Sequence, residues 1–191
     1  MSGEKVLLVI GDAAEVVDTI YPYYRIPEDG YEVVVTAPEK RAYHLVVHEH
    51  RPDWDITVEK PGFSMQADIA FKDINPDDYL GMVITGGRAP EYLRYDDDLI
   101  RLVRYFDQHK KPIGSVCHGI EIVATADIIR DRRVTCVSKC RFDAQVCGGK
   151  WVDEPVVVDG NLVTARVAQD GTEWMREFIN LLNAARDSLR K

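Results

Sequence analysis

Residues 111–124 read KPIGSVCHGIEIVA, and within them the pattern of a strand changes abruptly to the pattern of a helix. Residues 112–116 are compact and mostly apolar, as in a strand that is covered on both faces. From Ile120 onward, apolar residues recur at helical spacing. Cys117 falls at the junction, so its side chain is predicted to project from the carboxyl end of a sheet, where open α/β folds bind ligands.

Cys117 is therefore a candidate nucleophile, on the same strand–nucleophile–helix arrangement that presents the serine of α/β-hydrolases. The partial positive charge and free N–H groups at the start of a helix favour a thiolate. A stabilisation of roughly 1–2 kcal/mol would lower the thiol pKa from about 8.5 to near neutrality. The alternative is a small buried side chain without chemistry, which is what most free cysteines are.

The composition suits one soluble domain, predicted to span residues 1–191. Hydrophobic residues make up 46% and charged residues 29% of the chain, as in ordinary globular proteins. The net charge of −8 argues against nucleic acid or an anionic membrane as a partner. The first residues show no signal-peptide pattern, and four scattered cysteines fit a reducing compartment, so we expect a cytoplasmic protein.

Strands and helices alternate along the chain, which predicts a doubly wound α/β domain with a mostly parallel sheet between helices. Strands are predicted at residues 5–10, 31–37, 80–85, 112–116, 133–137, 155–159 and 162–165. Helices are predicted up to about residue 25, over residues 96–109, from residue 120, and over residues 173–189. Residues 38–66 interrupt this pattern as an insertion, which is either a hairpin or an irregular excursion.

Three groups of residues follow the carboxyl ends of predicted strands. Glu15 comes after the first strand, Gly86-Gly87 after the third and Cys117-His118 after the fourth. If these strands are neighbours, the three groups converge on one crevice. Paired glycines at this place would let backbone N–H groups approach a ligand closely. Taken alone, Glu15 could equally be an acid that a helix dipole favours in the first turn.

The same residues resemble the ThiJ/PfpI superfamily (the DJ-one family) over nearly the whole chain. The resemblance is carried by Glu15, by TGGRAPEYLR at 85–94, by VCHG at 116–119, and by the segments at 151–153 and 159–165. Residues 47–49 and 59–62 further resemble its glyoxalase III-like branch. The resemblance implies a flavodoxin-like fold of the class I glutamine amidotransferase-like kind, a nucleophile elbow at Cys117 and a homo-oligomer.

The resemblance also implies catalytic roles. Cys117 would be the nucleophile, and a protonated Glu15 would be hydrogen-bonded to its sulfur, which is reasonable because a carboxyl beside a thiolate has a raised pKa. Backbone N–H groups of Gly87 and His118 would form an oxyanion site. Glu91 would orient His118 only if a neighbouring subunit supplies it. Further expected oxyanion and substrate contacts are Gly86, Arg88, Gly119 and His48.

The implied reaction begins with addition of Cys117 to the aldehyde of methylglyoxal, which gives a hemithioacetal. Glu15, with His118, would move a proton through an enediolate, and the thioester would hydrolyse to a 2-hydroxy acid such as lactate. Because sulfur is the covalent carrier, no metal or dissociable cofactor is expected. The alternatives are a PfpI-like cysteine peptidase or protein deglycase, and a redox-sensing stress protein or chaperone in which Cys117 is reversibly oxidised.

The role of Glu121 remains open at this point. Glu121 stands where many relatives carry a neutral glutamine, and it would oppose ionisation of Cys117 if it pointed inward. Residues 48–50 alternate in direction on a strand and do not converge on an ion. Cys136, Cys140 and Cys147 form no CxxC pair, so we expect no metal site.

Overall fold

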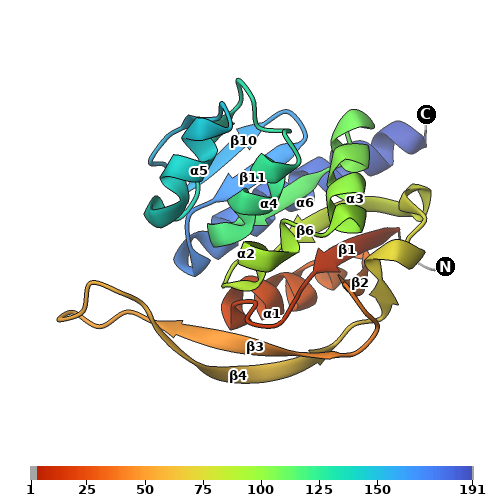
Figure 1. The fold of residues 1–191 in the computed structure, drawn as a ribbon. Coiled ribbons are helices and arrows are strands. Elements are labelled where there is room, and N and C mark those ends of the chain that lie inside the picture. The colour runs from red at the N-terminus through yellow and green to blue at the C-terminus, as the bar shows by residue number, and fades with distance from the viewer. Residues whose placement is uncertain (1–3, 191) are drawn as a thin grey trace.

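The computed structural model describes residues 4–190, which build a seven-stranded sheet with helices on both faces (Figure 1). The strand order is β10-β11-β7-β6-β1-β2-β5, and every neighbouring pair is parallel except β10 with β11. These strands are β1 (Lys5–Val9), β2 (Glu32–Ala37), β5 (Ile69–Ala70), β6 (Tyr79–Ile84), β7 (Ile113–Val116), β10 (Val156–Asp159) and β11 (Leu162–Ala165). The predicted α/β fold is confirmed. Residues 1–3 and 191, which the predicted domain and the signal-peptide prediction include, lie outside the described residues.

The order of the sheet brings β7, β6 and β1 side by side, as the convergence of the three sequence groups requires. Val6, Leu7 and Leu8 of β1 are completely buried, because helices cover both faces of this central strand. The predicted hairpin at Asp159-Gly160-Asn161 is also confirmed, with Val156 paired to Ala165. The carboxyl ends of the three central strands therefore form one edge.

Helices cover both faces of the sheet (Figure 1). On one face, α1 (Val16–Arg25) contacts β1, and α6 (Gly171–Leu189) contacts β6, β7 and β11. On the other lie α2 (Ala89–Leu93), α3 (Asp97–Gln108) and α4 (Ile120–Thr125), of which α3 and α4 contact β7. Trp174 and Phe178 of α6 are buried, as the predicted apolar face requires. The structure describes no helix that is long and apolar enough to cross a membrane.

The insertion at residues 38–66 is a β-hairpin that stands apart from the main sheet (Figure 1). Its strands β3 (Ala42–Glu49) and β4 (Val58–Gln66) are antiparallel. The hairpin is attached to the β1–α1 connection by two backbone hydrogen bonds, from Ala13 N–H to His44 O and from Val46 N–H to Ala14 O. Of the two alternatives left by the sequence, the hairpin is correct, and it lies over the start of α1.

The segment that follows α4 is less regular than predicted. The strand expected at residues 133–137 is reduced to β8 (Arg133–Val134), which pairs with β9 (Lys150–Trp151) in a separate small sheet. A 3-10 turn at Ser138–Cys140 leads into α5 (Arg141–Val146). Neither α2 nor α5 was expected, because helices of five or six residues are too short to show a period.

Candidate active site

Cys117 lies in the turn between β7 and α4 with a φ of 59°, a left-handed conformation that is rare for a residue with a Cβ. This backbone places its partly buried side chain at the carboxyl edge of the sheet. Gly119 permits the tight turn, since a Cβ there would lie 2.7 Å from Ser115 Oγ and 3.0 Å from Ile84 O. The predicted nucleophile elbow is therefore present.

Two backbone amides face the Cys117 sulfur, those of Gly87 and His118. Gly87 has a φ of +80°, and a Cβ there would lie 2.3 Å from Ala13 O and 2.4 Å from Glu15 N. Only glycine fits a loop that presses so closely on the β1–α1 connection. The structure thus brings together the two backbone amides that the family resemblance predicts for an oxyanion site.

A carboxyl group that the sequence analysis missed lies beside the sulfur. A Cβ on Gly86 would lie 2.4 Å from Asp18 Oδ2 and 2.6 Å from Cys117 Cβ, so the two side chains meet over this glycine. The Gly86 N–H donates to Asp18, whereas Asp18 Oδ1 has no hydrogen-bond partner within residues 4–190. Burial, and then the nearby charge of Glu15, raise the pKa of Asp18 well above its usual value. Asp18 is therefore a buried acid that favours its protonated form.

Glu15 takes a different role from the one expected. Its Oε2 accepts a hydrogen bond of 2.8 Å from the Asp18 N–H and thereby caps α1. No hydrogen bond joins Glu15 to Cys117 in the part of the chain that the structure describes, so the implied pairing with the sulfur is wrong here. The reason is geometric: Asp18, three residues further along the helix, is the acid that turns toward the sulfur.

The pKa of Cys117 is raised rather than lowered as predicted. Burial is the largest cause and the charge of Asp18 the second, while the amides of Gly87 and His118 act in the opposite direction. The prediction considered only the helix terminus, but α4 has six residues and the cost of desolvating a thiolate is larger. A thiol with a raised pKa needs a base to take its proton during the reaction.

His118 is placed to be that base. Its Nδ1 lies 3.3 Å from Cys117 Sγ. Burial, and next the nearby His48, lower the pKa of His118, so that the ring is neutral near pH 7. A neutral ring has one nitrogen free to accept a proton, which makes the Cys117–His118 contact a competent nucleophile–base pair.

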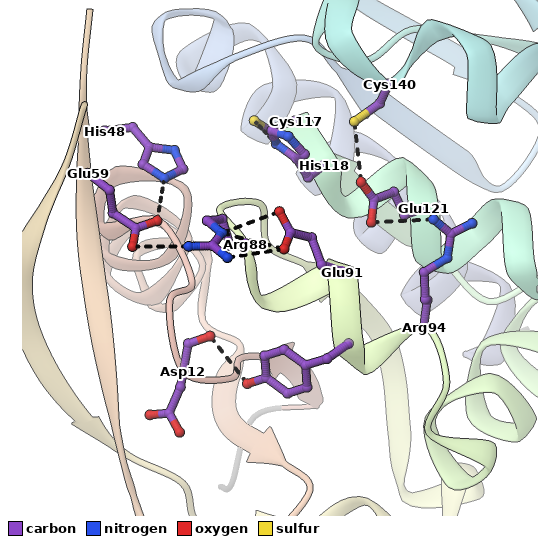
Figure 2. A network of polar contacts seen from close by, with 11 residues as sticks. Asp12, His48, Glu59, Arg88, Glu91, Arg94, Cys117, His118, Glu121 and Cys140 are labelled. Carbon is purple, nitrogen blue, oxygen red and sulfur yellow. Dashed lines mark hydrogen bonds and ion pairs between the residues drawn. The ribbon is translucent and has the colours of Figure 1, made fainter. Parts of the chain in front are cut away.

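Near the site, a chain of charged contacts joins the hairpin to α2 (Figure 2). Arg88 lies between two carboxylates, with Nη1 3.7 Å from Glu59 and Nε 3.4 Å from Glu91. Glu59 also lies 3.3 Å from His48 Nε2. Glu91 raises the pKa of His118 from within the same chain. Its action from a neighbouring subunit, and the homo-oligomer that this needs, stay predictions.

The cavity beside Cys117 is small, about 60 Å³. Since about 10–15 Å³ of such space holds one water molecule, the cavity suits a substrate of a few heavy atoms. The lining comes from five parts of the chain. They are the start of α1 with Glu15 and Asp18, the hairpin with His48, His50 and Thr57, the elbow with Cys117 and His118, the later turn with Val137 and Lys139, and residues 167–169. His48 is thus brought to the site as expected, whereas Arg88 and Glu91 lie outside this lining.

The DJ-1/PfpI family model matches residues 4–181. The chain belongs to the DJ-1/PfpI family. A deglycase of Pyrococcus abyssi is 38% identical to this DJ-1/PfpI member, over 93% of this chain and 99% of the relative. The deglycase PfpI of Pyrococcus furiosus is 35% identical over the same shares.

Solved structures show the same DJ-1/PfpI fold. The ThiJ/PfpI domain protein from Brachyspira murdochii superposes with a TM-score of 0.81 at 19% sequence identity, and the match covers 96% of this chain and 99% of that one. At this identity the likeness concerns the fold alone. It confirms the predicted flavodoxin-like arrangement of the sheet.

Proposed function

We propose that this DJ-1/PfpI member is an enzyme that converts methylglyoxal and related 2-oxoaldehydes to 2-hydroxy acids, with Cys117 as the covalent carrier. The observation that carries the proposal is the set of groups around one sulfur: His118 Nδ1 at 3.3 Å, the amides of Gly87 and His118, and the buried carboxyl of Asp18. Together they provide a nucleophile, its base, an oxyanion site and a second acid–base group.

Each of these groups has a role in the proposed reaction. His118 takes the thiol proton as the Cys117 sulfur adds to the aldehyde carbon, and the two amides stabilise the oxyanion of the hemithioacetal. Asp18 in its ionised form, a stronger base because its pKa is raised, removes the proton from that carbon and returns it to the neighbouring carbonyl carbon through an enediolate. His118 gives the proton it took from the thiol to the oxygen on that neighbouring carbon, which completes the 2-hydroxy thioester and regenerates the neutral ring. Water hydrolyses the resulting thioester and frees the thiol.

A protein deglycase is the second candidate, supported by the names of the Pyrococcus relatives. It would use the same residues on a methylglyoxal adduct of an amine or thiol. The small volume of the cavity favours a three-carbon group as the reacting part in either case and disfavours a peptidase. The redox-sensing alternative needs Cys117 alone and gives no role to Asp18 or the two amides.

The test is lactate formation from methylglyoxal without glutathione, with Cys117→Ala, Asp18→Asn and Glu15→Gln beside the wild type. We expect Cys117→Ala to be inactive and Asp18→Asn to lose about 10²–10⁴-fold in kcat, as is typical for a lost acid–base group. Glu15→Gln should lose much less, because its amide oxygen can still cap α1. A wild type without turnover, in which peroxide selectively oxidises Cys117, would overturn the proposal in favour of the redox sensor.

The two enzymatic candidates are separated by supplying a preformed hemithioacetal together with aminoguanidine, which scavenges free methylglyoxal. A glyoxalase loses its substrate under these conditions, so lactate formation stops. Lactate formation at an undiminished rate would instead show that the adduct itself is the substrate, as in a deglycase.

A further inference from the structure

Three side chains with metal-binding atoms meet beside the active-site cysteine: His118, Glu121 and Cys140. One ligand atom of each lies within 4.8 Å of the other two. Glu121 is on α4, one helical turn after His118, and Cys140 is brought to it by the 3-10 turn before α5 (Figure 2). Glu121 and Cys140 are buried, which distinguishes the cluster from a solvated acidic surface.

The contacts inside the cluster already orient two of the three groups. The Cys140 thiol donates to Glu121 Oε1 at 3.5 Å. Glu121 Oε2 lies 3.5 Å from Arg94 Nη1, and Arg94 is itself held by Asp143 at 3.2 Å. Arg94 therefore occupies one carboxylate oxygen and leaves the other directed at the sulfur. Outer contacts of this kind fix the ligands of protein metal sites.

We propose that His118, Glu121 and Cys140 form a binding site for a thiophilic divalent cation, for which Zn²⁺ is the best match. Zinc binds imidazole nitrogen, carboxylate oxygen and thiolate sulfur at about 2.0–2.3 Å, which places tetrahedral ligand atoms about 3.3–3.8 Å apart. Side chains now within 4.8 Å need only a small contraction to reach that spacing. Magnesium and calcium are disfavoured, because they prefer oxygen ligands.

Binding exchanges one proton for the metal. The Cys140 S–H bond breaks, a zinc–sulfur bond forms, and the proton that now points to Glu121 Oε1 leaves to solvent. Glu121 needs no proton transfer to bind through that oxygen when it is ionised. Three protein ligands leave a fourth position for water, as in open zinc sites.

One consequence rests on the proposed function. A neutral imidazole that gives the lone pair of one nitrogen to a metal carries its proton on the other. Metal-bound His118 therefore has no free lone pair with which to accept the proton of Cys117. We expect Zn²⁺ to inhibit turnover reversibly and a chelator to restore it.

The test titrates chelator-treated, metal-free protein with Co²⁺, followed by absorption spectroscopy, and with Zn²⁺, followed by calorimetry. We expect one ion per chain and a thiolate-to-cobalt charge-transfer band. Cys140→Ser should remove the band, and both Cys140→Ser and Glu121→Gln should weaken Zn²⁺ binding at least 10-fold. Cys147→Ser, a matched loss of a thiol at the end of α5, should change neither measurement.

Other results would overturn the site. They are the absence of saturable binding, a cobalt–thiolate band that survives Cys140→Ser, and a band that Cys117→Ala removes, since the last would show capture by the reactive thiol alone. Glu121→Gln keeps the size of the side chain and so tests the site even if Cys140→Ser does not fold. Lactate formation by the metal-free wild type is measured separately, so failure of the proposed function is distinguishable from failure of the metal site.

Discussion

Cys117 and Asp18 meet over Gly86, and burial is the first cause of the raised pKa of each. The charge on Asp18 is the second cause for Cys117, so the two groups titrate as a pair in which ionisation of one opposes ionisation of the other. For Asp18 itself, burial and then the charge of Glu15 raise the pKa, so its carboxyl holds its proton to higher pH than an ordinary aspartate does.

Replacing Asp18 by Asn should therefore ease the ionisation of Cys117. We expect the pH profile of Cys117 alkylation by iodoacetamide to shift to lower pH in Asp18→Asn, because the charge that raises the thiol pKa is gone. Mass spectrometry of the peptide that contains Cys117 measures the rate. Glu15→Gln should give a smaller shift of the alkylation profile, because the charge of Glu15 raises the pKa of Cys117 less than the charge of Asp18 does. A shift to higher pH would mean that Asp18 donates a proton to the thiolate instead.

Gly86 is the second residue on which the site depends. A methyl group there would overlap Asp18 Oδ2 and Cys117 Cβ, so Gly86→Ala should separate the two groups. We expect a loss of kcat of at least 10-fold in a protein that still folds, measured as lactate formation beside a thermal melt. Gly171→Ala is the matched control, because its Cβ would meet only Tyr21 at 3.5 Å and should leave kcat unchanged.

At the scale of elements, the hairpin β3–β4 determines how the start of α1 is held. Its backbone binds the β1–α1 connection at Ala13 and Ala14, and Gly62 of β4 lies against Val16 of α1. A Cβ on Gly62 would lie 2.4 Å from Val16 Cγ2 and 3.0 Å from Leu45 O. The hairpin therefore packs on α1 immediately beside Glu15 and Asp18.

Gly62→Ala should push the hairpin from α1 and cost about 1–3 kcal/mol, as overpacking typically does. For a chain of this size that corresponds to a fall in Tm of about 2–12 °C. Combining it with Val16→Ala removes the overlapping methyl group, so the double variant should be more stable than the sum of the single effects predicts. Thermal melts of the four proteins measure this coupling, and strict additivity would contradict the contact.

At the scale of the whole molecule, Asp18 is a buried carboxyl inside a fold whose core is mostly apolar. Its folded-state pKa lies above the unfolded value of about 3.9. Such a group contributes stability that is present below the unfolded pKa and is lost as the pH rises through the folded pKa. The site thus lowers the stability of the fold at neutral and alkaline pH.

Asp18→Asn, which cannot ionise, should therefore have a higher Tm than the wild type at pH 8. The difference should shrink toward pH 5, where Asp18 is increasingly protonated. Thermal melts across this range provide the measurement. Glu121→Gln provides a second comparison, because Glu121 is another buried acid whose pKa is raised by burial. A wild type that is the more stable protein at pH 8 would show that the folded structure stabilises the ionised carboxyl.

Much of the fold can be predicted from the sequence, because strands, turns and the strand-to-helix elbow each show a local sequence pattern. The apolar runs of β1, β6 and β7, the hairpin between β10 and β11, and the break at Cys117 all depend on residues within about ten positions of one another. The convergence of Glu15, Gly87 and Cys117 was predicted on the condition that their strands are neighbours, and the order β7-β6-β1 meets that condition. The short helices α2 and α5 could not be predicted from the sequence, because a helix of fewer than two turns shows no hydrophobic period.

Only the tertiary structure decides which acid faces the sulfur and how the sulfur titrates. Glu15 and Asp18 are one turn apart, and the choice between them depends on how α1 is rotated against the hairpin and the sheet. The pKa of Cys117 depends on desolvation by the entire surrounding chain. Likewise, Cys140 reaches Glu121 through a turn of irregular backbone that no periodicity predicts. Local patterns determine where the chain changes direction, whereas burial and contact are properties of the packed molecule.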